Sequence, residues 1–144
     1  MRQFLRRHHR IAIDTSIFIY EMEANGRYVT LADGIFQWLE QSGHAGVTST
    51  ITMTELLVPP YREKDEDRVN LFYGLLTTYP NLEWIPPGLE IADLAARFRA
   101  EHRLKTPDAL HAATAVWSGA TGFVTNDPVF KRVTAFETFV LDDA

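Results

Sequence analysis

The sequence predicts an α/β fold with three layers, in which helices cover both faces of a central, mainly parallel sheet of four to five strands. Short apolar runs alternate along the chain with longer segments whose apolar residues recur at helical spacing. Strands separated by helices pair in parallel, and their crossover helices cover the two faces of the sheet. The 144 residues contain no internal repeat or linker, so we expect a single domain spanning 1–144.

The strands are predicted from short apolar runs bounded by turn residues. The first, 11–13, is a continuous apolar run that ends abruptly in Asp14, Thr15 and Ser16, a pattern typical of a strand buried on both faces. Later strands are predicted at 47–50, 82–85, 122–125 and 139–141, the last at an edge. Asp14 stands where open parallel sheets bind ligands. It could equally serve only to cap the next helix.

Helices are predicted between these strands from apolar spacing and end signals. The predicted segments are 17–20 capped by Thr15 or Ser16, 31–39, 51–58 stopped by Pro59 and Pro60, 69–76, 91–102, and 106–115 with Thr106 as N-cap. Asp127 is expected to cap a short helical turn through Phe130. The basic segment 1–9 is expected to be a flexible lead-in, with an RNA-phosphate contact as the alternative.

Composition excludes several classes of protein. The chain has no cysteine, so disulfides, thiolate metal sites and thiol catalysis are excluded. No apolar stretch is long enough to span a membrane. Asp14 interrupts the apolar run that a signal peptide would need after 6–10, so a cytoplasmic protein is expected. A net charge of −5 argues against a broad nucleic-acid-binding surface, although metal binding by several acids would weaken that objection.

Four acids are expected to converge on one edge of the sheet. Asp14 and Asp127 follow strands, whereas Glu55 and Asp108 lie near the starts of helices. Singly, each has an ordinary structural explanation as a helix cap, a first-turn acid or a surface residue. Together they would repel one another strongly, and a divalent cation would resolve that conflict. Oxygen ligands alone suit Mg²⁺ or Mn²⁺, so His111 is expected to be a packed or edge histidine rather than a ligand.

With these residues in place, the chain resembles the PIN-domain ribonucleases, most closely the VapC-type toxins of bacterial and archaeal toxin–antitoxin pairs. The matching motifs are Ile-Asp-Thr-Ser at 13–16, Thr-Glu-Leu at 54–56, Thr-Pro-Asp-Ala-Leu-His-Ala-Ala-Thr-Ala at 106–115 and Thr-Asn-Asp at 125–127. The third motif is the most specific. In order and spacing, the motifs cover nearly the whole chain from Arg10 onward.

The resemblance implies a PIN-like domain and a Mg²⁺-dependent endoribonuclease toxin, with Mn²⁺ as a substitute metal. The catalytic and metal-binding quartet would be Asp14, Glu55, Asp108 and Asp127, supported by Thr125 and Ser16. A metal-activated water would cleave the RNA phosphodiester, leaving 5′-phosphate and 3′-hydroxyl ends. The resemblance also implies a cognate antitoxin protein as partner and a homodimer, in which some of Trp38, Phe72, Tyr73 and Trp117 would lie at the interface.

Two other classes are compatible with the pattern. A receiver-like signalling domain shares the alternation of strands and helices, but it needs paired acids after the first strand, where Asp14 stands alone. A non-catalytic PIN-fold module that binds RNA or protein is the second alternative, although such a module would be expected to lose acids. Candidate RNA-phosphate contacts, none of them placed by the sequence, are Arg10, Arg62, Lys64, Lys105, Lys131 and Arg132.

Overall fold

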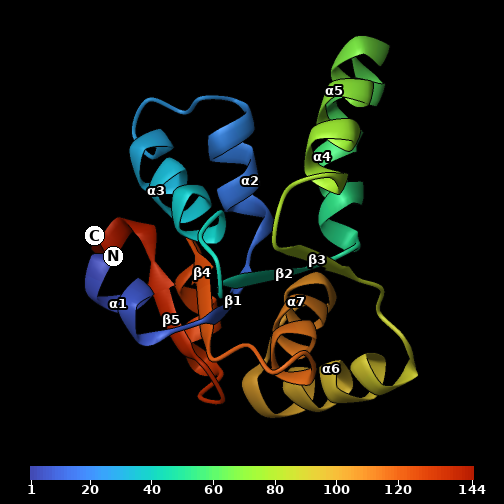
Figure 1. Ribbon diagram of the computed structural model, residues 1–144. Coiled ribbons are helices and arrows are strands. Elements are labelled where there is room, and N and C mark those ends of the chain that lie inside the picture. The colour runs from blue at the N-terminus through green and yellow to red at the C-terminus, as the bar shows by residue number, and fades with distance from the viewer.

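The computed structural model describes residues 1–144 and contains one five-stranded sheet in the order β3-β2-β1-β4-β5 (Figure 1). All four strand pairings are parallel. This confirms the predicted central parallel sheet, and the strand that begins the alternation in the sequence occupies its centre. The strands are β1 (Arg10–Ile13), β2 (Ala45–Ser49), β3 (Leu82–Ile85), β4 (Gly122–Thr125) and β5 (Glu137–Val140).

Helices cover both faces of the sheet and complete the three layers. Successive residues of a strand point to opposite faces, so Ile11 and Ile13 pack in a different cluster from Ala12. Helices α6 and α7 pack on the Ala12 face, and α1, α2 and α3 on the other. The helices are α1 (Arg2–Arg7), α2 (Thr15–Met22), α3 (Val29–Leu39), α4 (Ile51–Arg62), α5 (Glu66–Thr77), α6 (Leu89–His102) and α7 (Thr106–Trp117), with two short 3₁₀ helices, η1 (Pro128–Arg132) and η2 (Leu141–Asp143).

Helix α7 brings the third sequence motif close against the sheet. Its alanines Ala109, Ala112, Ala113 and Ala115 are fully buried, and their small side chains allow the helix to pack closely against the strands. Thr106, predicted as the N-cap, is instead the first residue of the helix, because Lys105 takes the N-cap conformation. None of the helices combines the length and the apolar character needed to cross a bilayer.

The first residues form a packed helix, so the expectation of a flexible lead-in at 1–9 is wrong. Phe4 and Leu5 of α1 are 3% and 7% exposed and belong to the core on the α3 face of the sheet. Trp38 of α3 donates its indole N–H to the Leu5 carbonyl at 3.2 Å. Gly122 of β4 makes the close approach possible, since a Cβ there would lie 2.7 Å from Cζ of Phe4.

A buried histidine fastens the end of α1 to the β4–β5 side of the sheet. One ring nitrogen of His8 lies 2.8 Å from Oγ1 of Thr121, and the other lies 2.8 Å from Oε2 of Glu137. Arg7 pairs with the same Glu137 carboxylate. Burying an imidazole without partners would be unfavourable, and these contacts satisfy both nitrogens. The basic segment 1–9 is therefore held by the apolar contacts of Phe4 and Leu5 and by the hydrogen bonds of His8.

Helix α4 continues through Pro59 and Pro60, whereas the sequence predicted that it would stop there. The fixed φ of proline is compatible with a helix, and the helix extends to Arg62 with Pro60 buried. The two prolines have no N–H to donate to the carbonyls one turn earlier, so α4 forgoes two backbone hydrogen bonds. Packing of α4 against α5 compensates for this loss, and the two helices project from the body as a hairpin (Figure 1).

The packing of α1 predicts that Phe4→Ala lowers the free energy of unfolding by about 3 kcal/mol, the usual scale for removing a buried phenylalanine side chain. Urea denaturation followed by circular dichroism measures it. Leu89→Ala is the matched control, because Leu89 is 91% exposed and its truncation should change stability by less than about 0.5 kcal/mol. Equal stabilities of the two variants would show that α1 is not held by its core contacts.

Candidate active site

A cavity of about 290 Å³ opens at the carboxyl edge of the sheet and collects all four predicted acids. Asp14 follows β1, and Asp127 follows β4. Asp108 lies on the first turn of α7, and Glu55 lies just past the first turn of α4. The carboxyl ends of parallel strands meet at one edge, which explains the convergence. The lining residues are Asp14, Thr15, Ser16, Ile19, Tyr20, Glu55, Asp108, His111, Asn126, Asp127 and Phe130.

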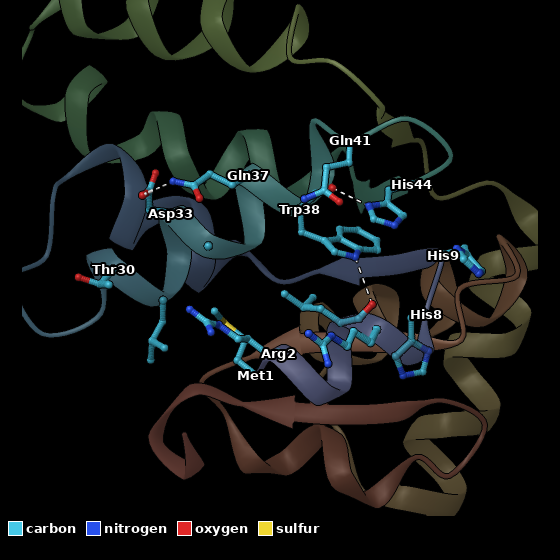
Figure 2. Close-up of a pocket in the computed structure, with 14 residues that line it drawn as sticks. Met1, Arg2, His8, His9, Thr30, Asp33, Gln37, Trp38, Gln41 and His44 are labelled. Carbon is cyan, nitrogen blue, oxygen red and sulfur yellow. Dashed lines mark hydrogen bonds between the residues drawn. The ribbon is translucent and has the colours of Figure 1, made fainter.

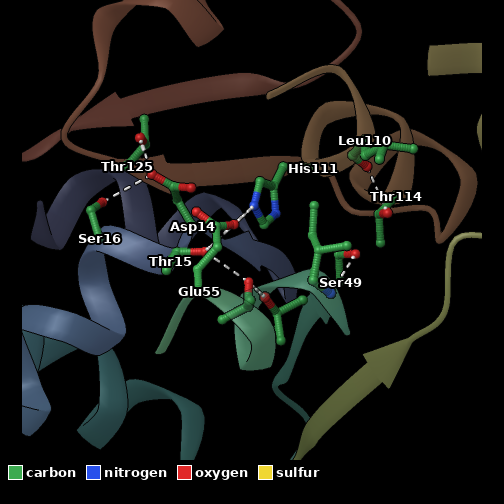
Figure 3. Close-up of polar contacts among 12 residues, drawn as sticks. Asp14, Thr15, Ser16, Ser49, Glu55, Leu110, His111, Thr114 and Thr125 are labelled. Carbon is green, nitrogen blue, oxygen red and sulfur yellow. Dashed lines mark hydrogen bonds and ion pairs between the residues drawn. The ribbon is translucent and has the colours of Figure 1, made fainter. Parts of the chain in front are cut away.

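Asp14 is buried at the floor of the cavity, with 8% of its surface exposed. Oδ2 of Asp14 accepts hydrogen bonds from Ser16 Oγ at 2.9 Å and from Thr125 Oγ1 at 2.8 Å (Figure 3). The residue takes the N-cap backbone position of α2, but its side chain makes no capping bond. Its carboxylate therefore faces the two predicted supporting hydroxyls, and the interpretation of Asp14 as a simple cap is wrong.

Thr125 links the acids that follow the two central strands. Its hydroxyl donates to Asp14 and accepts a hydrogen bond from the backbone N–H of Asp127 at 3.0 Å. Asp127 is exposed, and its Oδ1 accepts from the Val129 N–H at 2.9 Å. This confirms the prediction that Asp127 caps a short helical turn, here η1. One carboxylate oxygen of Asp127 is thus used structurally, and the other has no protein partner.

Glu55 is held by two groups that the sequence did not connect to it. Nε2 of His111 lies 2.8 Å from Oε1 of Glu55, and Thr15 Oγ1 donates to the same oxygen at 3.2 Å (Figure 3). Burial opposes ionisation of Glu55, but the hydrogen bond and charge of His111, aided by Thr15, outweigh it and hold the pKa of Glu55 below its ordinary value. His111 is 5% exposed, which fits the expectation of a packed histidine.

A chain of buried threonines supports this contact from beneath. Thr15 Oγ1 lies 3.0 Å from Thr52 Oγ1, which lies 2.9 Å from Thr48 Oγ1. Thr48 in turn donates to the backbone carbonyl of Ile13 at 3.0 Å. The chain joins α2, α4 and β2 to the end of β1. It fixes the turn of α4 that carries Glu55, because buried hydroxyls without partners would be costly.

Asp108 experiences the combined charge of the other acids. Partial burial raises the pKa of Asp108, and the negative charges of Asp127, Asp14 and Glu55 raise it further, with His111 partly offsetting them. A raised carboxyl pKa means that the fold disfavours the ionised form. The cavity therefore has an excess of negative charge that its own residues do not neutralise.

The donor chemistry of the cavity fits a hard divalent cation. Its charged donors are carboxylates, which are the ligands of Mg²⁺ and Mn²⁺, and a cation would relieve the repulsion on Asp108. As the side chains stand, no group of three or more His, Asp or Glu residues is arranged to hold a metal ion. Glu55 faces His111, and Asp127 caps η1. Metal binding would therefore require these side chains to reorient.

Sequence reasoning placed the acids together but not the groups around them. Tyr20 and Asn126 also line the cavity, where the Asn126 side-chain amide donates to the Tyr20 hydroxyl at 3.0 Å. Two signals in the sequence could have indicated these neighbours. Asn126 directly precedes Asp127, and His111 lies one helical turn after Asp108. None of the candidate RNA contacts lines the cavity, namely Arg10, Arg62, Lys64, Lys105, Lys131 and Arg132. Arg10 instead pairs with Glu83 across the sheet.

Comparison with known proteins agrees with the fold. The model of the PIN domain family matches residues 11–135. Solved structures share the fold. A chain of VapBC-1 from nontypeable Haemophilus influenzae aligns with a TM-score of 0.71 and 21% identity, covering 92% of this chain and 98% of that one. A chain of DNA-bound VapBC from Salmonella typhimurium aligns with a TM-score of 0.70 and 18% identity, covering 92% of this chain and 98% of that one. For FitAcB from Neisseria gonorrhoeae the values are 0.67 and 19%, covering 93% and 99%. No curated protein sequence matches the chain significantly.

The charge on Asp108 predicts that Asp108→Asn will melt at or above the temperature of the parent protein in chelator at neutral pH. Because the pKa of Asp108 is raised in the fold, its ionisation costs stability as pH rises through that pKa, and asparagine removes the cost. The advantage should shrink as pH falls through the raised pKa and vanish below about 3.9, the ordinary aspartate pKa, where the carboxyl group is protonated in both the folded and the unfolded state.

Thermal denaturation over a pH series measures this difference. Asp93→Asn is the control, because Asp93 is an exposed helical aspartate outside the cavity and without an ion-pair partner. A clearly lower melting temperature for Asp108→Asn alone would mean that Asp108 acts chiefly through the dipole of α7.

Proposed function

The chain belongs to the PIN domain family, and from this membership we propose that it is a Mg²⁺-dependent endoribonuclease of the VapC toxin type. The observation that carries the proposal is the convergence of Asp14, Glu55, Asp108 and Asp127 on one cavity. The pKa of Asp108, raised first by burial and then by the neighbouring acids, supports it, since negative charge that the protein does not neutralise is what a cation site requires. Mn²⁺ would substitute for Mg²⁺, because both prefer oxygen ligands.

The residues that line the cavity would have different roles in such a site. Asp14, Glu55, Asp108 and Asp127 would hold the metal, which when bound supplies Lewis acidity and a water activated at neutral pH. Ser16 and Thr125 keep Asp14 oriented toward the cavity. Thr15 and His111 hold the carboxylate of Glu55, and both bonds favour its charged form. The chain needs no side-chain nucleophile for this chemistry.

A non-catalytic PIN-fold module that binds RNA or protein is the second candidate. Its support is the pairing of Glu55 with His111 and the lack of a three-residue arrangement suited to metal. In that case His111 would hold Glu55 permanently away from a cation. The two candidates differ in whether added metal changes the protein and whether RNA is cut.

We also propose two protein partners. Structural neighbours include a "Toxin-antitoxin complex from Klebsiella pneumoniae", and a cognate antitoxin is proposed here by analogy. The α4–α5 hairpin offers exposed apolar side chains to such a partner, namely Val58, Tyr61, Leu71, Tyr73 and Leu75. A homodimer is the other proposal. Of the interface candidates, Tyr73 and Trp117 are exposed, whereas Trp38 and Phe72 lie in the core and are not available to a partner.

The first functional prediction concerns metal-dependent cleavage. Purified protein with Mg²⁺ or Mn²⁺ should cleave RNA, and Asp14→Asn or Asp108→Asn should reduce the rate by about 100-fold or more, the scale for removing one electrostatic group from an active site. Sequencing of new 5′ ends after expression of the protein would locate the cuts. Thr125→Val should give a smaller loss of about tenfold, because it removes the hydrogen bonds to Asp14 and to the Asp127 N–H but leaves all four acids in place.

Asp93→Asn is again the matched control and should cleave as the parent does. Circular dichroism would establish that each variant is folded. If folded Asp14→Asn and Asp108→Asn proteins both cleave RNA at the parental rate, the acidic cavity is not the active site. A protein that neither responds to added metal nor cleaves RNA would favour the non-catalytic module.

The second functional prediction concerns inhibition by the antitoxin. A guanidinium group can engage carboxylates bidentately, so a basic residue of the antitoxin should enter the cavity and compete with Mg²⁺ for the acids. Inhibition in cleavage assays should therefore weaken as Mg²⁺ increases. The partner would be sought as the product of an adjacent reading frame that co-purifies with the protein. Inhibition that survives alanine substitution of the partner's basic residues would rule out competition.

A further inference from the structure

A second and larger cavity, of about 860 Å³, lies between α1 and α3 (Figure 2). His8 and His9 immediately precede β1, and His44 precedes β2, so the cavity opens at the amino edge of the sheet, opposite the acids. We call it the α1–α3 groove. Its lining residues are Met1, Arg2, Leu5, Arg6, His8, His9, Thr30, Leu31, Asp33, Gly34, Gln37, Trp38, Gln41 and His44.

The groove is basic although the protein as a whole is acidic. Arg2 and Arg6 both line it, are exposed, and have no acidic partner, in contrast to Arg7, which pairs with Glu137. Their i, i+4 spacing places two like charges on one face of α1, which is unfavourable for an isolated helix. The single acid of the lining is Asp33, and Gln37 occupies one of its oxygens at 2.8 Å. An anion between the guanidinium groups would relieve their repulsion.

Aromatic nitrogen rings gather at the other end of the groove. His44 stacks on Trp38 with ring centroids 4.2 Å apart and an angle of 11° between the planes. Its Nδ1 donates to the Trp38 carbonyl at 2.7 Å, which fixes the orientation of the ring. The exposed ring of His9 lies 6.0 Å from that of His44. Figure 2 shows these rings beyond the end of α1, on the side away from Asp33 and Thr30.

The groove is preorganised because α1 is fixed in place. Phe4 and Leu5 anchor the helix in the core, and His8 anchors its end to Thr121 and Glu137. The arginines therefore project from a rigid element rather than from a mobile arm. A rigid binding surface loses less entropy when a ligand binds, so the anchoring of α1 favours a binding role for its exposed face.

We propose that the α1–α3 groove binds the phosphate backbone of single-stranded RNA, with Arg2 and Arg6 contacting phosphates and the rings of His9 and His44 contacting a base. Guanidinium groups bind phosphates through paired, charge-assisted hydrogen bonds. Single-stranded RNA is typically held by such cations together with rings that stack on bases. The rings distinguish RNA from an acidic peptide, which would need only the charges. The inference deepens the proposed function, since it adds a contact to the RNA that the nuclease would cut.

The position of the groove determines what its loss should change. It lies at the edge of the sheet away from the acids, so it would bind a part of the RNA remote from the cleaved bond. Such a contact should contribute to RNA affinity and KM and leave kcat at saturating RNA unchanged. The acidic cavity contains no Lys or Arg, and a separate basic surface would supply the positive charge that it lacks.

The test measures binding of a short labelled single-stranded RNA to the whole protein in chelator, where metal-dependent cleavage does not occur. Arg2→Gln/Arg6→Gln should bind about tenfold more weakly or worse at low salt, the scale of a lost charge-assisted contact. The slope of log affinity against log salt should fall by about 1.4, corresponding to two single-strand phosphate contacts. Glutamine keeps the helix propensity of arginine, and circular dichroism would establish that α1 is retained.

Arg97→Gln is the matched control, because Arg97 is an exposed arginine of α6 that lines neither cavity. It should bind RNA as the parent does. His9→Ala should also weaken binding, since it removes a ring that would contact a base. Binding of the double arginine variant that equals that of Arg97→Gln would overturn the proposal. Competition by polyglutamate as effective as that by unlabelled RNA would also overturn it, because the groove would then recognise negative charge alone.

These measurements separate the groove from the proposed nuclease activity. Loss of RNA affinity in chelator supports the groove whether or not the parent protein cleaves RNA with metal. Conversely, the parent protein could cleave RNA while Arg2→Gln/Arg6→Gln leaves kcat and KM unchanged. That result would support the nuclease activity and overturn the proposal for the groove.

Discussion

The site depends on satisfying one buried carboxylate at the end of the central strand. Asp14 is almost inaccessible to water, and its Oδ2 accepts hydrogen bonds from the hydroxyl groups of Ser16 and Thr125. A buried carboxylate without such donors would be strongly destabilising. The requirement joins the ends of β1 and β4, because Thr125 lies on the neighbouring strand and its hydroxyl also accepts the backbone N–H of Asp127. Strand pairing and placement of the acids are thus secured by the same threonine.

The remaining acids show how the fold tolerates charge that it does not neutralise. Glu55 is stabilised by His111 and Thr15, so its ionised form is favoured. Asp108 receives no comparable contact, and repulsion from the other acids adds to the effect of its burial. The unfavourable charge is concentrated on one residue in the first turn of α7, while the neighbouring carboxylates Asp14 and Glu55 have hydrogen-bond partners. Proteins commonly retain such local conflict where a ligand is to bind.

Sequence patterns predicted the parts of the fold that depend on neighbouring residues. The fourth strand, β4, has the predicted bounds, and the acids that follow β1 and β4 lie where parallel pairing requires. The packed helix α1 was missed, because the burial of Phe4 depends on space above Gly122, more than a hundred residues away. The continuation of α4 through its prolines depends on contacts with α5. The contact between His111 and Glu55 joins two helices, and neither sequence motif specifies it alone.

The order of the strands has a consequence for synthesis of the protein. β1 is the first strand made, but it pairs with both β2 and β4, so the centre of the sheet closes only when the fourth strand has been translated. Thr125 and Asp127 emerge at that same late stage, more than a hundred residues after Asp14. At roughly 5–20 residues per second, the delay is several to about twenty seconds. A nascent chain therefore passes through most of its translation with the set of four acids incomplete, and the parallel topology itself delays the appearance of the site.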